Sequence, residues 1–382
     1  MLLRTATCWV ALGASACSQT EPKRALAPET TALVSAPTVV AADAKSAAPS
    51  VIASGTPTPL TATNELWFTG MCDASGAVPL NDRLFAVADD EDNILRVYDA
   101  DRGGAPLGMA DVSTRLALPQ KAAKPKKKPR KKPMKWPETD IEAATRVGEL
   151  AFWITSHGRN SSGKLKQERH RLFATSLPQD ASELELSVEG VAYDRLLPDL
   201  VRDPRFRAFE LERASELAPK DPGGLNIEGM TAREEGGVWI GFRNPVPNGR
   251  ALLFSLLNPE QVIQGEAARF GDPVLLDLGG LGVRSLSSWH GRYLIVAGHY
   301  AGGAASKLYS WNGRDELSPL GTLGLSQFNP EGFFTPEERD TILLLSDDGT
   351  VVVDDTECKR QKDPAKKRFR GAWIALPPTS PR

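Results

Sequence analysis

The pattern that decides the fold is NIEG at residues 226–229 followed by VWIGFR at residues 238–243. The second run consists of β-branched and aromatic residues and ends in polar ones, which is typical of a strand. A further apolar run at 251–257 follows a polar loop. The sequence therefore predicts a β-hairpin preceded by a small acidic motif.

The same hairpin pattern recurs along the chain. Its first strand is predicted at residues 84–89, 151–156, 238–243, 293–298 and 341–346, and each is followed by a second apolar run. A repeat of about 40–50 residues that contains four strands is typical of a β-propeller. We therefore predict an all-β fold with a single β-propeller of five or six blades, since SVEG at 187–190 resembles the acidic motif and leaves a degenerate sixth blade open.

An acidic motif precedes four of the five hairpins, and an arginine, Arg284, stands at the equivalent place before the fourth hairpin in the chain. Equivalent residues of a propeller lie on one ring around its central channel. The carboxylates that we expect to converge there, as metal ligands, are Asp73, Glu142, Glu228 and Glu331. Each pair of charges at ~6 Å costs on the order of 3 kcal/mol at an effective dielectric constant of ~20, so something must compensate them.

Three kinds of compensation stay open. A hard cation such as Ca²⁺ takes six to eight oxygen ligands and would use the whole ring as its site. Arginines at repeat positions, Arg159, Arg243 and Arg284, would instead form internal salt bridges. Protonation of one acid is the third route. The sequence predicts a calcium site or an arginine-compensated channel.

Polar loops follow the second strands and are expected at the channel mouth. His157 and His299 are candidates for a general base, and Arg159 and Arg243 for a clamp on an anionic group. The further predicted binding residues are Asp89, Asp90, Asn244, Arg284 and Asp347. No Gly-x-Ser-x-Gly motif and no paired Cys-x-x-Cys occurs, which disfavours a serine hydrolase and a structural zinc site.

The two ends of the chain differ in character. Residues 1–17 resemble a secretory signal whose ASAC ending is similar to a bacterial lipobox. Lipidation of Cys17, plain cleavage before it and an uncleaved start all stay open. Residues 18–60, rich in Ala, Pro, Ser and Thr, predict a disordered tether, and the propeller is expected over 61–382.

Two inserts interrupt the predicted propeller. Residues 121–135 contain nine Lys or Arg and no acid, although the net charge of the chain is −2. This basic insert predicts either contact with an anionic surface or a solvated loop, and the scarcity of aromatic residues excludes sequence-specific reading of nucleic acid. Residues 193–216, rich in Leu, Arg and Glu, predict a helical insert.

Cysteine use is sparse. Cys72 and Cys358 are the two cysteines outside the signal region, one near each end of the predicted propeller. An oxidising compartment would allow them to pair and to fasten the ring where its ends meet. Two free buried thiols are the alternative.

The chain resembles a bacterial group known as domain of unknown function 3616. The stretches that carry the resemblance are CDASGAV (72–78), VADDEDNILRVY (87–98), DIEAA (140–144), TSHGRNSSGK (155–164), HRLFA (170–174), NIEGM (226–230), IGFRNPVP (240–247), LLDLGGLGVR (275–284) and PEGF (330–333). The group is similar to phytase-like and esterase-like propellers, so the resemblance implies a propeller. It supplies no catalytic residues.

These observations predict an exported protein, periplasmic or tethered to the membrane of a bacterial cell envelope. The function we expect is that of a monomeric binding protein whose acidic channel takes a small anionic molecule or an envelope component, and Ca²⁺ in the acidic ring stays open as its cofactor. A calcium-dependent hydrolase of phosphate esters, other esters or lactones is the alternative, and an envelope scaffold is a third. No window is long and apolar enough for a transmembrane span in the mature chain.

Overall fold

The computed structural model describes residues 59–119, 136–178, 184–303, 305–324 and 328–376. The chain divides into two units, Met1–Ser46 and Ala47–Arg382, and every described residue belongs to the second. The predicted signal region with Cys17, most of the predicted tether and the basic insert 121–135 therefore lie outside the described residues. The last two residues assigned to the tether form a strand, β1 (Pro59–Leu60).

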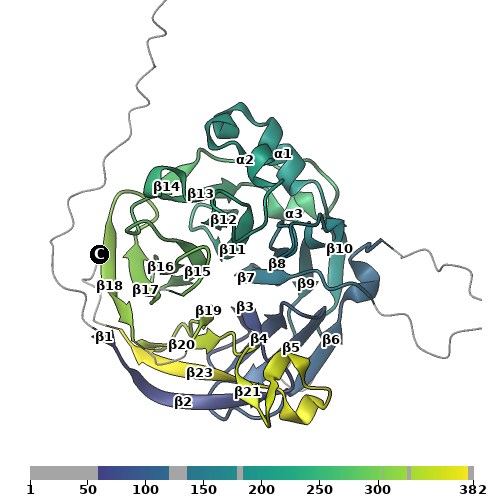
Figure 1. The fold of residues 1–382 in the computed structure, drawn as a ribbon, viewed down its shortest axis with the longest axis vertical. Coiled ribbons are helices and arrows are strands. Elements are labelled where there is room, and N and C mark those ends of the chain that lie inside the picture. The colour runs from purple at the N-terminus through teal and green to yellow at the C-terminus, as the bar shows by residue number, and fades with distance from the viewer. Residues whose placement is uncertain (1–58, 120–135, 179–183, 304, 325–327, 377–382) are drawn as a thin grey trace, which may run out of the picture. The chain divides into compact units, whose positions relative to one another are not determined.

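Five four-stranded antiparallel sheets form the blades of a β-propeller (Figure 1). Blade one contains β3 (Ala74–Pro79), β4 (Leu84–Asp89), β5 (Ile94–Asp99) and β6 (Gly108–Asp111). Blade two contains β7 (Ile141–Val147), β8 (Leu150–Thr155), β9 (Leu172–Ser176) and β10 (Val188–Tyr193). Blade three contains β11 (Asn226–Ala232), β12 (Val238–Asn244), β13 (Ala251–Leu256) and β14 (Val274–Leu276). Blade four contains β15 (Gly282–Trp289), β16 (Arg292–Gly298), β17 (Lys307–Trp311) and β18 (Leu317–Leu323), with β1 added at its edge.

The fifth blade closes the ring with strands from both ends of the described chain. Its order is β19 (Pro330–Phe334), β20 (Thr341–Ser346), β23 (Arg368–Ala375) and β2 (Ala62–Thr69). The N-terminal strand β2 pairs antiparallel with the C-terminal strand β23, and Figure 1 shows the two side by side. Pairing of the two ends covers edges that would otherwise stay open. The prediction that the ends complete one blade is confirmed.

The blade count is five in the described residues. Residues 187–190, which left a sixth blade open, belong to the outer part of blade two, where β10 pairs with β9. The stretch predicted to be helical forms α1 (Leu196–Arg202), the 3-10 helix Pro204–Phe209 and α2 (Leu211–Ala214) between blades two and three. The remaining short elements are α3 (Pro259–Val262), the hairpin β21 (Val352–Val353) and β22 (Thr356–Glu357), and 3-10 turns at Ser113–Arg115, Gln167–Arg169, Pro247–Gly249, Cys358–Arg360 and Pro364–Lys366. No helix in the described ranges is long and apolar enough to cross a bilayer.

Aromatic side chains fill the seam between blade five and blade one. Phe68 of β2 stacks on Phe369 of β23 with ring centroids 4.9 Å apart, and it meets Phe85 of β4 edge-on at 5.5 Å. All three rings are buried. Aromatic pairs of this kind contribute about 0.5–1.5 kcal/mol beyond their area burial, so they stabilise the seam at which the ring closes.

The innermost strands, β3, β7, β11, β15 and β19, surround the propeller axis (Figure 1). They pack so closely that a Cβ added to Gly76 of β3 would lie 2.5 Å from the backbone carbonyl carbon of Ala143 on β7. The glycine that follows the acidic motif therefore lets neighbouring blades approach each other. This packing places the starts of the innermost strands, which carry the acids, close together.

Candidate functional site

A β-bulge interrupts each innermost strand at the same point of the repeat. The strand register shifts there in all five blades. A bulge redirects the side chain of its extra residue. The residues at this point form what we call the inner ring: Ser75, Glu142, Glu228, Arg284 and Glu331. Asp73, which we predicted to share this ring, lies two residues earlier in the motif, where the other blades have Asp140, Asn226 and Asn329. Ser75 holds the ring position in blade one because its motif is Asp-Ala-Ser-Gly.

Arginines compensate one half of the inner ring. Arg243 Nη1 lies 2.6 Å from Glu228 Oε1. Arg284 Nε lies 3.7 Å from Glu228 Oε2, and the guanidinium of Arg284 also forms an ion pair with Glu331. All four side chains are buried. Burial, and then the charge of Arg243, lower the pKa of Arg284 to about 10. In blades three to five the predicted arginine-compensated channel is what the structure shows.

Five carboxylates, of which Asp140 alone is paired with an arginine of the described ranges, gather on the side of blades one and two. Asp73, Asp89 and Asp90 each offer an oxygen within 4.8 Å of the others, and so do Asp90, Asp140 and Glu142. Asp73 precedes β3, Asp89 ends β4, and Asp140 and Glu142 lie at the start of β7. We call these five residues the carboxylate cluster. Of the four predicted metal ligands, Asp73 and Glu142 belong to it, whereas Glu228 and Glu331 are paired with arginine.

Partners are unevenly distributed within the carboxylate cluster. Asp140 Oδ2 accepts from Arg169 Nη1 at 2.7 Å, and Asp89 Oδ1 accepts from the Glu91 amide at 2.9 Å. Asp73 is 4% exposed, yet its Oδ2 has no hydrogen-bond partner among the described residues. Neither Asp90 nor Glu142 forms a side-chain hydrogen bond or ion pair with any residue of the described ranges, and Asp90 Oδ1 is itself buried. Buried carboxylates without partners are costly unless a proton or a cation neutralises them.

The pKa values in the carboxylate cluster reflect this missing positive charge. Burial, followed by the charges of Asp347 and Asp89, raises the pKa of Asp73 to about 9. Burial also raises the pKa of Asp89 to about 7 and that of Asp140 to about 6, and it raises the pKa of Glu142. Oxygen-only ligands of this kind suit a hard divalent cation such as Ca²⁺. The residues present therefore fit the predicted cofactor at the start of blades one and two.

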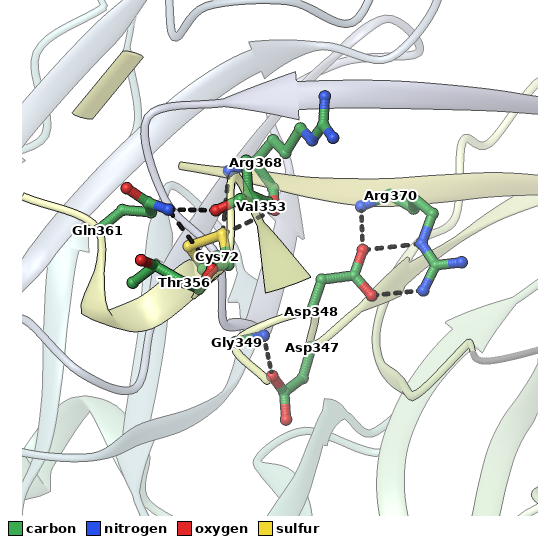
Figure 2. Close-up of a disulfide and its surroundings, with 10 residues drawn as sticks. Cys72, Asp347, Asp348, Gly349, Val353, Thr356, Gln361, Arg368 and Arg370 are labelled. Atoms are coloured by element: carbon green, nitrogen blue, oxygen red, sulfur yellow. Dashed lines mark hydrogen bonds and ion pairs between the residues drawn. A yellow bond between two sulfur atoms is a disulfide. The ribbon is translucent and has the colours of Figure 1, made fainter. Parts of the chain in front are cut away.

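A disulfide fixes the backbone immediately before Asp73. Cys72 and Cys358 are bonded, which joins the residue before Asp73 to the segment after β22 (Figure 2). The Cys72 carbonyl accepts from the Asp348 amide at 2.9 Å, and the Asp348 carboxylate pairs with Arg370 Nη2 at 2.7 Å. This arrangement fastens the closing blade to the start of blade one, next to the carboxylate cluster.

Asp347 is a predicted binding residue that the structure places beside Asp73. The two residues form an isolated antiparallel bridge. Asp347 Oδ1 accepts from the Gly349 amide, drawn in Figure 2, and Oδ2 accepts from Asn329 Nδ2, both at 2.9 Å. Its carboxylate is therefore held by donors and contributes negative charge to the cluster.

The two candidate bases occupy different surroundings. His157 is buried, its Nδ1 lies 2.8 Å from the Thr155 carbonyl, and its Nε2 has no partner. Burial, followed by the charge of His170, lowers the pKa of His157 to about 3, so the imidazole is neutral. His299 is half-buried and stacks on Tyr300, and its backbone carbonyl accepts from Arg243. This geometry favours structural roles over proton transfer for both residues.

Two other predicted site residues hold the scaffold together. Arg159 donates from Nε to the Ser215 carbonyl at 2.8 Å and from Nη1 to the Gly163 carbonyl. It therefore connects two loops and takes no part in the ion pairs between arginine and glutamate of the inner ring. Asn244 donates to the Pro219 and Asp221 carbonyls at 2.9 and 2.7 Å and anchors the segment after the helical insert. The sequence analysis did not include Asp140 among the candidate site residues, although the recurring Asp or Asn at the head of each acidic motif was a signal for its place in the carboxylate cluster.

A pocket of about 560 Å³ lies at the opposite ends of the innermost strands. Arg233 and Arg292 line it, but their guanidinium groups are already engaged. Arg233 lies over the Trp239 ring at 4.7 Å and near Glu235, and Arg292 donates to Ser310 and Glu316. These two arginines therefore already have protein partners, in contrast to most of the carboxylate cluster.

A family model described as "Protein of unknown function (DUF3616)" matches residues 128–319, about half of the chain. Among solved structures, glutaminyl cyclase from Myxococcus xanthus is 10% identical, covers 84% of this chain and 100% of its own, and has a TM-score of 0.43. The PQQ-bound aldose sugar dehydrogenase from Streptomyces coelicolor is 10% identical with the same coverage and a TM-score of 0.40. A search of curated proteins found no match. The structural likenesses carry no argument about activity.

Proposed function

The chain belongs to the DUF3616 family of proteins of unknown function, and we propose that it is a calcium-dependent binding protein of the bacterial cell envelope. The carboxylate cluster holds the cation at one mouth of the channel. The bound cation would offer a coordination position to a small anionic ligand.

The observation that carries this proposal is the set of buried carboxylates without a positive partner. Glu142 is 9% exposed and has no hydrogen bond or ion pair with a described residue, whereas the equivalent Glu228 and Glu331 each have an arginine. The same repeat position is thus neutralised by side chains in two blades and left open in a third. A divalent cation supplies the missing charge with ligands of the type it prefers.

Hydrolysis is the second candidate function. Asp90 is only half-buried, whereas the other cluster members are buried, so a cation bound by Asp90 would face solvent. A cation with an open position can polarise a phosphoryl or carbonyl oxygen of a bound ester. Burial makes His157 a weak base with a pKa of about 3, and His299 lies outside the carboxylate cluster, so binding is preferred.

Export is part of the proposal. A disulfide between Cys72 and Cys358 is of a kind that persists in oxidising compartments and is rare in the cytosol. Together with the signal-like start of the sequence, it supports a periplasmic or membrane-tethered location.

Thermal unfolding of the full chain tests the proposal. After exhaustive chelation, Ca²⁺ at ~100 times its Kd should add about 2.7 kcal/mol to the free energy of unfolding. For a domain of about 300 residues this raises Tm by about 4 °C. Glu142→Gln should reduce the shift, while Glu149→Gln, an exposed acid near the other end of the same blade, should keep it in full. No shift with Ca²⁺, Mg²⁺ or Mn²⁺ would reject the proposal. Turnover of phosphate esters or lactones by the calcium-loaded wild type, lost in Glu142→Gln, would favour the hydrolase.

A further inference from the structure

Asp90 belongs to two metal-ligand groups at once. It lies within 4.8 Å of ligand oxygens of Asp73 and Asp89 on one side, and of Asp140 and Glu142 on the other. The first pair comes from blade one and the second pair from the start of blade two. Asp90 follows β4 and so stands between the two blades. A carboxylate has two oxygens and can bind one cation with each.

Each group contains one buried carboxylate with an oxygen that lacks a hydrogen-bond or ion-pair partner among the described residues. In the first group this residue is Asp73, whose Oδ2 is buried and unpartnered. In the second group it is Glu142, which is 9% exposed and forms no hydrogen bond or ion pair with a described residue. These unpartnered groups are independent of each other because they lie on different innermost strands. One cation placed in either group would leave the carboxylate of the other group unsatisfied.

The local charge leads to the same count. Five carboxylates form the carboxylate cluster, and the one cation in direct contact with them among the described side chains is Arg169, which Asp140 shares with Glu138 outside the cluster. At least four negative charges are therefore uncompensated when all five are ionised. One divalent cation neutralises no more than half of them, so the charge leaves room for two. Two-metal sites of this kind recur in proteins that act on phosphate esters.

We propose that the carboxylate cluster binds two divalent cations, bridged by the carboxylate of Asp90. Asp73 and Asp89 complete the first site, and Asp140 and Glu142 complete the second. This inference rests on the proposed function, because it assigns the stoichiometry and the ligands of the same cation site.

Calcium binding to the full chain tests the stoichiometry. The chelated protein is titrated with Ca²⁺ by calorimetry, and bound metal is counted by elemental analysis after gel filtration. We expect two ions per chain for the wild type and for Glu149→Gln. Asp89→Asn and Glu142→Gln should each retain one ion. Asp90→Asn should weaken both sites, by about 10–100-fold each.

The outcomes separate the two proposals. No bound cation in the wild type would reject both the proposed function and this inference. One bound ion would reject the second cation alone. Complete loss of binding in both Asp89→Asn and Glu142→Gln, with unfolding curves that show a folded chain, would also reject it, since the two sites would then be one.

A second measurement needs no variant and therefore still tests the inference if the variants fail to fold. The chain is loaded with Tb³⁺ alone or with a mixture of Tb³⁺ and Eu³⁺, and the Tb³⁺ luminescence lifetime is recorded. Two ions bridged by one carboxylate are close enough for efficient energy transfer, so the mixture should shorten the lifetime several-fold. An unchanged lifetime at saturating lanthanide would overturn the inference.

Discussion

Replacing Arg243 by methionine tests the division of the inner ring into an arginine-paired half and a carboxylate half. Arg243 Nη1 lies 2.6 Å from Glu228 Oε1, and both side chains are almost completely buried, at 6% and 4% exposed. Methionine keeps most of the length of the side chain and removes its charge. The substitution leaves Glu228 as a buried carboxylate with Arg284 Nε at 3.7 Å as its remaining positive neighbour.

The magnitude follows from the burial of this pair. Removing one partner of a buried ion pair costs about 3–5 kcal/mol, because the other charge stays buried without compensation. The remaining contact with Arg284 places our expectation near the lower value, about 3 kcal/mol. With an unfolding entropy of about 2.1 cal/mol/K per residue and a domain of about 300 residues, this corresponds to a decrease in Tm of about 5 °C.

The assay is thermal unfolding of the chelated full chain at pH 7, repeated with saturating Ca²⁺. Arg146→Met, which replaces an arginine that is 42% exposed, is the matched control and should change stability by less than about 0.5 kcal/mol. The double variant Arg243→Met/Glu228→Gln should recover most of the loss, since no unpaired charge remains. The reasoning is refuted if Arg243→Met costs less than about 1 kcal/mol. It is also refuted if Ca²⁺ selectively restores the variant, because Glu228 would then belong to the cation site.

Three further predictions concern the closure, the titration and the packing of the ring. Cys358→Ser should lower the free energy of unfolding by about 2–5 kcal/mol and weaken Ca²⁺ binding, because the disulfide with Cys72 holds the segment next to Asp73. A calorimetric Kd for Ca²⁺ equal to that of the wild type would contradict the expected loss of binding. The chelated protein should lose stability as pH rises from about 4 to about 9. Burial raises the pKa of Asp73 from 3.8 to about 9, so between these pH values the folded state binds a proton that the unfolded state has released. A Tm that rises steadily up to pH 9 would contradict this prediction. Gly76→Ala should lower the free energy of unfolding in urea by at least about 1–3 kcal/mol, since the added Cβ would lie 2.5 Å from the backbone of Ala143. An unchanged urea midpoint would show that blades one and two pack less closely than the structure indicates.

Repetition made much of the fold predictable from the sequence. Each hairpin had to bury an apolar strand pair, and an acidic motif recurred before four of the five hairpins, so the propeller could be predicted from the spacing of the apolar runs. The sixth blade stayed open because a strand pattern does not reveal which sheet the strand joins. Residues 187–190 carry an acidic motif similar to the others, yet they lead into β10, which pairs with β9 of blade two.

The candidate site was only partly predictable for a related reason. Asp73, Glu142, Glu228 and Glu331 were grouped because each is the acid of its motif. The direction of each acidic side chain depends on whether the residue lies at the β-bulge. The position of a bulge depends on the pairing register of the strands, which the sequence pattern does not give. Asp73 therefore lies with Asp89 and Asp90, which come from another strand and the loop that follows it.

The sequence by itself determined that this chain would form a ring of short blades with acids and arginines at equivalent positions, because the repeat and its polar residues are local features. Only the tertiary structure decided which charges meet. Arg243 and Arg284 contact the acids of blades three and five, and no arginine side chain contacts Glu142 of blade two within the described ranges. Electrostatic energy depends on distance and burial, and both are fixed only when the ring closes.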